Sequence, residues 1–411
     1  MGNRVVAFPE SSRVLVWHLL YAACMGTNTA LIYFLPFLAR QHFVASNWQT
    51  TVLTAAIPVM QLFSIFWNHF YARTSTTGYL VTLCLLLSLP IAALGLSSGV
   101  WTIMGLFLVA AFGNAGLSPL NGDLLRTCYA PSVRGRVFGL VSTAQMIAAM
   151  LTGLMMGFWS QRNSEAFRFF LPLIAFVQIS GLSVIRRIAR MPLFAERLRP
   201  ATQNEVTLLT PFREMFAVLR ADPRFAAYEV AFMSYGVGWM ICTALLPALA
   251  TDKLHLDYHQ YAEATIVLFQ LVSILLFASL GRVVDRIGPM RLATLSFVWL
   301  TLYPIGLFFA PGYHALILVS CLYAVGMVGV NLTWTLGPVA LAADASRASH
   351  YLAIHTTMVG IRGIVAQGLG MALYSVTGSF SIPLAMAAVG FMWAAQRMNI
   401  LSKRTRPALI M

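Results

Sequence analysis

Blocks of apolar residues recur along the whole chain and are separated by short polar segments. Each block is about 20 residues long, the length of α-helix needed to cross a hydrocarbon core of about 30 Å. The blocks predict membrane-spanning helices at residues 14–38, 49–70, 79–97, 100–122, 137–160, 167–186, 226–250, 261–281, 291–310, 314–338, 350–376 and 380–398. We therefore expect an all-α integral membrane protein with twelve transmembrane helices.

The composition agrees with a membrane protein and excludes several other classes. Of the 411 residues, 59% are hydrophobic and 10% are charged, whereas a soluble domain carries about 25% charged residues. The five cysteines are scattered without a Cys-x-x-Cys pair, so neither a disulfide framework nor a metal site is predicted. The sequence holds no nucleotide-binding loop, catalytic triad or pair of catalytic carboxylates. We expect no enzyme activity and no cofactor.

The net charge of +14 would by itself suggest nucleic acid as a partner, but its distribution indicates a membrane. Of the 27 Lys and Arg residues, 22 fall on the side that holds both termini, and 4 fall on the other side. Because positively charged loops stay in the cytoplasm, both termini and the long middle loop are predicted to be cytoplasmic. The expected surroundings are the lipid bilayer of an inner or plasma membrane, and no nucleic acid is expected.

A polar stretch in the middle of the chain, Arg186–Arg224, divides the spans six and six. It predicts an N-terminal six-helix bundle at residues 1–186, a cytoplasmic linker at 187–225 and a C-terminal six-helix bundle at 226–411. Within the linker, a surface helix is expected near Pro211–Leu219.

The two halves of the chain also look alike. Residues 35–39, Leu-Pro-Phe-Leu-Ala, close the first span, and residues 246–250, Leu-Pro-Ala-Leu-Ala, close the seventh, an offset of 211. The fifth and eleventh helices are expected to open after Arg134 and Arg347, an offset of 213. Such a near-constant offset indicates a duplicated unit and predicts two pseudo-symmetric halves. Parallel six-helix halves with a mid-membrane site between them are one known plan of transporters.

The loop between the eighth and ninth spans, residues 281–291, reads Gly-Arg-Val-Val-Asp-Arg-Ile-Gly-Pro-Met-Arg. It closely resembles the G-x-x-x-D-R-x-G-x-x-R signature of the major facilitator superfamily. The resemblance implies the transporter fold of that family and a latch that helps to hold one conformational state. In such a latch the carboxylate faces a helix N-terminus and the arginines face the lipid surface. The latch residues predicted in this loop are Gly281, Asp285, Arg286, Gly288 and Arg291.

Two other loops carry the resemblance in a weaker form. After the fourth span, residues 131–139 resemble the family's second cytoplasmic signature, P-x-x-R-G-x-x-x-G, which adds Arg134 and Gly135 to the latch. In the first half, Ala72 stands where the family has an aspartate, so a latch made by that carboxylate is missing there. The glycine-proline signature of the family's antiporters is absent from the fifth span, which disfavours drug export.

The resemblance further implies that the first, fourth, seventh and tenth helices line a central cavity. Polar and aromatic residues share one face on each of these helices. Because lipid cannot satisfy polar side chains, such a face turns toward the bundle interior or toward water. The candidate cavity residues are His18, Tyr21, Asn28, Asn114, Ser118, Asn121, Tyr228, Tyr235, Trp239, Asn331 and Thr335. The alternative is that they make ordinary interhelical hydrogen bonds and core aromatic contacts.

Arg362 is the one Arg or Lys placed inside a predicted span, and His355 precedes it by seven residues on the same face. An Arg at mid-membrane costs about 2.5–3.5 kcal/mol on insertion scales. It therefore needs a partner, which is either a group of the substrate or a carbonyl or carboxylate of the protein. Both readings stay open at this point, and both residues join the candidate cavity.

Carboxylates able to carry a coupling proton are few, since no Asp or Glu occupies the centre of a predicted span. A proton-driven exporter of organic cations would be expected to have one. The remaining candidates for proton coupling are Glu229, His355 and His18.

These features predict a secondary active or facilitative transporter that moves a small polar or anionic organic solute by alternating access, with protons as the candidate coupling ion in symport or antiport. It is expected to be a monomer. Two alternatives are kept: a non-transporting membrane sensor or assembly factor of the same fold, favoured by the degenerate signature at Ala72, and a proton-coupled drug or metabolite exporter.

The charge bias gives a test of topology. A reporter that is active only in the cytoplasm, fused after Met411, should be active, and so should one inserted in the predicted linker 187–225. An insertion next to Arg162, on the predicted outer side, should be inactive. An extracytoplasmic reading at the C-terminus would overturn the orientation.

Overall fold

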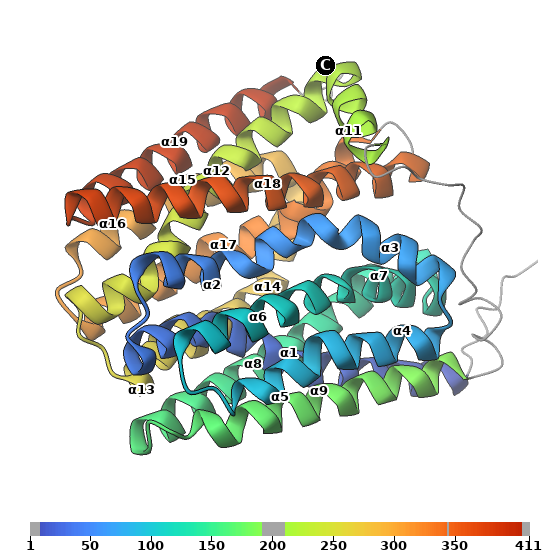
Figure 1. Cartoon of the computed structure of the whole chain (residues 1–411). Coiled ribbons are helices and arrows are strands. Elements are labelled where there is room, and N and C mark those ends of the chain that lie inside the picture. Colours follow the sequence, from blue (N-terminus) through green and yellow to red (C-terminus); the bar gives the residue numbers. More distant parts are fainter. Residues whose placement is uncertain (1–8, 191–209, 343–344, 405–411) are drawn as a thin grey trace, which may run out of the picture. The chain divides into compact units, whose positions relative to one another are not determined.

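The computed structural model describes residues 9–190, 210–342 and 345–404, and these residues form helices without a β-strand (Figure 1). By length and apolar composition, ten continuous helical segments among them are able to cross a membrane, or eleven if α2 and α3 count as one interrupted span. The prediction of an all-helical membrane protein is confirmed. Residues 191–209 of the predicted linker lie outside the described residues, whereas the surface helix expected near Pro211 is present as α11 (Thr210–Ala221).

The chain divides into two compact units, and the first contains residues 1–32 and 63–203. The helices of this unit are the first part of α1 (Pro9–Phe43), α3 (Ser64–Arg73), α4 (Thr76–Leu83), η2 (Cys84–Ser88), α5 (Leu89–Leu94), α6 (Val100–Ala115), α7 (Leu117–Cys128), α8 (Pro131–Arg162) and α9 (Phe167–Ala189). Within it, α9 packs along α4, η2 and α5, and α6 packs against η2 and α5. Helix α8 was expected to begin after Arg134, but it begins at Pro131, because a proline suits the first turn of a helix.

The second unit contains residues 33–62 and 204–411. Its elements are the rest of α1, α2 (Asn47–Met60), most of η1 (Gln61–Phe63), α11, α12 (Pro223–Ala248), η3 (Leu249–Lys253), α13 (Tyr258–Ala262), η4 (Glu263–Val267), α14 (Leu268–Ile287), α15 (Pro289–Leu300), α16 (Leu302–Phe309), α17 (Tyr313–Leu341), α18 (Ala345–Thr377) and α19 (Ser381–Arg404). Helix α12 packs against both α18 and α19, and α15 packs against α17 and α19. Helix α2 packs on α18 and α12, although it belongs to the first half of the sequence.

The twelfth predicted span, 380–398, coincides with helix α19. This helix is long enough to cross a bilayer but is not among the apolar segments counted above. Its last turns hold Gln396 and Arg397, which lower its mean hydropathy. Its inner face is nevertheless apolar and buried, with Phe391 and Met398 inaccessible to solvent.

A proline in α2 shows how the fold pairs a backbone carbonyl that has lost its helical hydrogen bond inside the apolar region. Pro58 has no N–H, so the carbonyl of Thr54 one turn earlier loses its usual helical donor. The side chain of Gln367 on α18 donates a hydrogen bond to that carbonyl, with an N···O distance of 3.2 Å. Gln367 is buried, and the bond ties α2 to α18 within the second unit.

Prolines also mark the points at which the chain passes from one compact unit to the other. In α1 the boundary follows Ile32, whose carbonyl is the one that Pro36 leaves without a helical donor. The second boundary follows Leu62 in η1, where the helical pattern tightens just after Pro58. Both boundaries thus lie within about one turn of a proline.

A polar network joins the end of α1 to η3 and α18 within the second unit. The Arg40 guanidinium donates to the Asp252 carboxylate at 2.5 Å, to the Thr251 hydroxyl at 2.8 Å and to the Asn47 side chain at 2.9 Å. The Tyr374 hydroxyl donates to the same carboxylate at 2.9 Å. Because three further side chains are hydrogen-bonded to this ion pair, the network is expected to couple more strongly than an isolated surface pair.

That expectation can be measured with a double-mutant cycle. We predict a coupling free energy between Arg40→Ala and Asp252→Ala of about 1–2 kcal/mol, because the pair is partly buried and hydrogen-bonded on both sides. The Arg168–Glu165 pair, with side chains 41% and 45% exposed, is the matched control and should couple by less than about 1 kcal/mol. Equal coupling in the two cycles, from melting curves in detergent, would contradict the role of the network.

Candidate functional site

In the first unit, the predicted cavity residues of α1 are hydrogen-bonded to those of α6 and α7. The Tyr21 hydroxyl donates to the Asn121 side chain at 2.8 Å, and the Asn28 side chain donates to that of Asn114 at 2.8 Å. Tyr21 and Asn28 are buried, whereas Asn121 is exposed. The structure therefore brings together the residues predicted on the first and fourth spans.

Two more contacts complete this polar layer. His18 Nδ1 lies 3.1 Å from the Tyr129 hydroxyl, and the Gln178 side chain of α9 donates to Oδ1 of the Asn28 side chain at 3.3 Å. Neither Tyr129 nor Gln178 was predicted, because pairing across helices leaves no local sequence signal. Ser118 is exposed. The sequence analysis kept ordinary interhelical hydrogen bonds as the alternative to a cavity, and these contacts are of that kind. A role of the candidate residues of the first unit in solute binding therefore stays a prediction.

In the second unit, the aromatic residues predicted on the seventh span are buried or half-buried along α12. The Tyr228 hydroxyl donates to the Thr333 carbonyl of α17 at 3.0 Å, and Trp239 Nε1 donates to the Tyr323 hydroxyl at 2.7 Å. The Tyr235 ring stacks on other aromatic rings. On the tenth span, Asn331 is exposed and Thr335 is half-buried. Helix α12 therefore presents an aromatic face to α17.

A buried acid–base pair lies on this face. His355 Nδ1 of α18 is 2.9 Å and 3.0 Å from the two oxygens of Glu229 on α12. Glu229 is 2% exposed and His355 is 1% exposed, and the rings of Phe232 and Trp334 pack around the imidazole. Among the residues that the structure describes, the other imidazole nitrogen, Nε2, has no hydrogen-bond partner. Glu229 and His355, which the sequence suggested separately as proton carriers, thus form one hydrogen-bonded pair.

Arg362 lies two turns further along α18 and is only partly satisfied. Its Nη1 donates to the Phe232 carbonyl at 2.8 Å, while Nε and Nη2 are buried and have no hydrogen-bond partner within the described part of the chain. The side chain is 3% exposed. Its Cζ lies 5.7, 6.0 and 5.5 Å from the ring centres of Tyr235, Trp239 and Trp334. The interpretation that Arg362 pairs with a carbonyl of the protein accounts for one of its three nitrogens. It does not account for Nε and Nη2.

A glycine makes room for this guanidinium. A Cβ atom built on Gly236 of α12 would lie 2.1 Å from Arg362 Cζ and 2.3 Å from its Nε. The guanidinium therefore lies directly against the α12 backbone, in a space that a side chain of any size would fill. Gly236 was not predicted, because one glycine in an apolar helix has many structural explanations.

The predicted latch residues lie where their signatures placed them, but their function stays a prediction. Gly288 follows α14 with φ +81°, a conformation that favours glycine and lets the chain turn directly into α15. Asp285 is exposed in the last turn of α14 and has no hydrogen-bond or ion-pair partner among the residues that the structure describes. Arg134 donates to the carbonyls of Tyr129 and Arg126 at 2.9 and 2.7 Å and so caps the end of α7.

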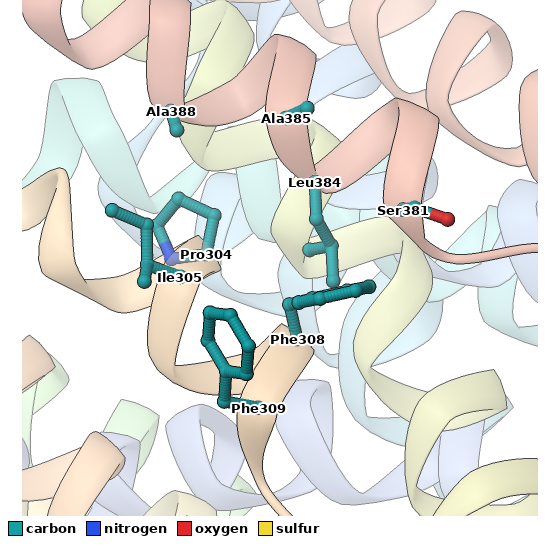
Figure 2. A pocket seen from close by; sticks show the side chains of 8 residues that line it. All are labelled: Pro304, Ile305, Phe308, Phe309, Ser381, Leu384, Ala385 and Ala388. Carbon is teal, nitrogen blue, oxygen red and sulfur yellow. The ribbon is translucent and has the colours of Figure 1, made fainter.

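Two cavities in the second unit differ in chemistry. Figure 2 shows one of about 220 Å³ between α16 and α19, with Pro304, Phe308, Phe309 and Leu384 among its apolar walls. Such walls suit hydrocarbon and offer little to a polar solute. The other, of about 40 Å³, is lined by Leu246 and by hydroxyl-bearing and aromatic side chains: Tyr33, Thr243, Tyr261, Thr265, Phe269, Tyr303, Ser320 and Tyr323. Through the Trp239–Tyr323 hydrogen bond, this second cavity adjoins the aromatic face of α12.

Solved structures with the same fold are transporters. The chain matches a variant of the nucleoside transporter NupG with a TM-score of 0.70 and 10% identity, covering 96% of this chain and 98% of that one. It matches a variant of the peptide transporter POT in complex with alafosfalin with a TM-score of 0.73 and 15% identity, covering 96% and 94%. A bacterial homologue of the human lysosomal transporter Spinster matches with a TM-score of 0.61 and 13% identity, covering 97% and 95%. These likenesses show the fold that this chain shares with the three proteins.

The family follows from the sequence itself. The profile of the Major Facilitator Superfamily matches residues 17–367, and the chain belongs to that superfamily. It is therefore a membrane transporter of that family and not an enzyme. No curated protein matches the chain in a direct sequence search.

The close approach of Arg362 to α12 gives a stability test. Gly236→Ala should lower the free energy of unfolding by about 1–3 kcal/mol, because the new methyl group displaces the guanidinium from its packed position. Gly368→Ala on α18 is the matched control, since a Cβ there meets open space, and it should be neutral or slightly stabilising. Equal melting temperatures for the two variants would show that the guanidinium does not depend on Gly236.

Proposed function

We propose that this transporter carries a small polar or anionic organic solute by alternating access and couples its movement to protons. The observation that supports this best is the group of three ionisable side chains on α12 and α18: Glu229, His355 and Arg362. All three are buried within helices able to span a membrane. Ionisable residues are costly there, and they mark solute or ion pathways in membrane proteins.

The Glu229–His355 pair supports proton coupling. A carboxylate and an imidazole that share a hydrogen bond can gain or lose one proton while the rest of the site keeps its packing. Nε2 of His355 has no partner among residues 9–190, 210–342 and 345–404, so a group or a water molecule that reaches it would complete a route for that proton. His18, the third candidate, lies beside Tyr129 with no carboxylate within 4.0 Å among the described residues.

The fold neighbours support a polar solute. The names of two of them refer to nucleosides and peptides, which are polar molecules of moderate size. In the second unit of this chain, the mid-helix charges and the hydroxyl-lined cavity offer complementary groups for such a solute. Both termini are proposed to be cytoplasmic on the charge bias of the loops.

A sensor or assembly factor with this fold is the second candidate. One observation favours it: the first-half copy of the cytoplasmic signature has Ala72 in place of the acid, so the latch is asymmetric. Solute flux through purified protein in proteoliposomes separates the two functions, because a sensor would bind its solute without moving it.

Proton coupling is tested with Glu229→Gln in proteoliposomes, using solutes found by a thermal-shift screen. The wild type should accumulate or expel the solute in response to a pH gradient. The variant should lose this response and still exchange labelled for unlabelled solute, since exchange needs no net proton movement. Glu165→Gln, at a half-exposed carboxylate, is the matched control and should behave as wild type.

A gradient response that survives in Glu229→Gln would contradict the assignment of the proton to this pair. Retained exchange in the same variant also serves as the check that it folds.

A further inference from the structure

The two nitrogens of Arg362 without a partner, Nε and Nη2, belong to one edge of the guanidinium. Their N–H bonds run parallel in the plane of the group, at the spacing of the two oxygens of a carboxylate. The opposite corner, Nη1, is already occupied by the Phe232 carbonyl. What remains free is thus the fork with which Arg binds a planar oxyanion.

Among the described residues, no protein group is hydrogen-bonded to this edge. Glu229, the carboxylate on α12, is paired with His355. No carboxylate of the described residues lies within 4.0 Å of Arg362. Leaving two donors of a charged group buried and unpaired is costly. A ligand that supplied two oxygens would remove this cost.

The surroundings restrict the charge of that ligand. Between residues 225 and 248, throughout α17, and from 348 to 377, Arg362 is the one Arg or Lys in the sequence. A single guanidinium neutralises one negative charge, so a monoanion fits better than a phosphate that carries two.

The surroundings also favour a particular chemistry for the uncharged part of the ligand. Three aromatic rings, those of Tyr235, Trp239 and Trp334, stand around the guanidinium at 5.5–6.0 Å. Aromatic rings bind flat, apolar groups by stacking and by edge-to-face contacts. Beyond Trp239, the hydroxyl-lined cavity of about 40 Å³ offers room for a small polar end.

We propose that Arg362 binds the carboxylate of a small organic monoanion whose flat apolar part packs against Tyr235, Trp239 and Trp334. This assignment rests on the proposed transport function and names its class of solute. The guanidinium is positioned for this role by the Phe232 carbonyl and by the missing side chain of Gly236.

The test compares four probes on the purified full-length protein: benzoate, its neutral amide benzamide, the cation benzylamine, and acetate, which has the carboxylate without the ring. Benzoate should raise the melting temperature and bind with a measurable Kd in calorimetry, acetate should bind more weakly, and the other two should have no effect. The pattern isolates the contributions of the carboxylate and the ring.

Arg362→Lys keeps the charge and loses the fork, so benzoate should bind about 10–100-fold more weakly. Gly236→Ala retains the arginine and displaces it, and should lose affinity as well, which keeps the test valid if Arg362→Lys folds poorly. Arg397→Lys, at an exposed position of α19, is the matched control and should bind as wild type.

Three results would overturn the proposal: benzoate affinity unchanged in Arg362→Lys, equal responses to benzoate and benzamide, or no response to benzoate in a protein that transports neutral or cationic solutes. In the last case the transport function stands and the solute class is wrong. Failure of every solute in a broad screen to cross proteoliposomes would instead refute the transport function itself.

Discussion

Inside a bilayer no water is available to satisfy a polar group, so each buried donor or acceptor must find its partner within the protein. Most of this structure can be understood from that constraint. Pro58 leaves the Thr54 carbonyl without its helical donor, and Gln367 of a neighbouring helix supplies one. Tyr21 and Asn28 pair with side chains of other helices in the same way. The helices are thus joined by specific bonds in a region where apolar contact alone gives little preference among neighbours.

Against this background, the exceptions carry the functional information. Arg362 has two nitrogens and His355 has one that the described residues do not satisfy. Both lie on α18 against the aromatic face of α12, and Glu229 completes the charged group. The other buried side-chain atoms without a partner among the described residues are oxygens of serine and glutamine, so the unpaired nitrogens all belong to these two ionisable side chains. Unpaired donors of ionisable groups are the ones that a solute or a proton carrier can use. In a transporter, the transported solute and a coupling proton are the species that bind transiently at such groups.

The apolar blocks were enough to predict an all-helical membrane protein, because a span of about 20 residues is a local property of the chain. Arg362 and His355 were also found from the sequence, since charge within an apolar block is rare and easily seen. The pairing of His355 with Glu229 could not be predicted, because the two residues are 126 positions apart and meet only through packing. Gly236 shows the same limit: its importance lies in the side chain that another helix places against it.

The central claim is that the free edge of Arg362 recognises a carboxylate. A structure of the protein with a benzoate-type ligand tests it most directly. The claim predicts the two carboxylate oxygens about 2.7–2.9 Å from Nε and Nη2, with the ring of the ligand against Trp239 or Trp334. A ligand bound elsewhere, with both nitrogens still without a partner, would contradict it.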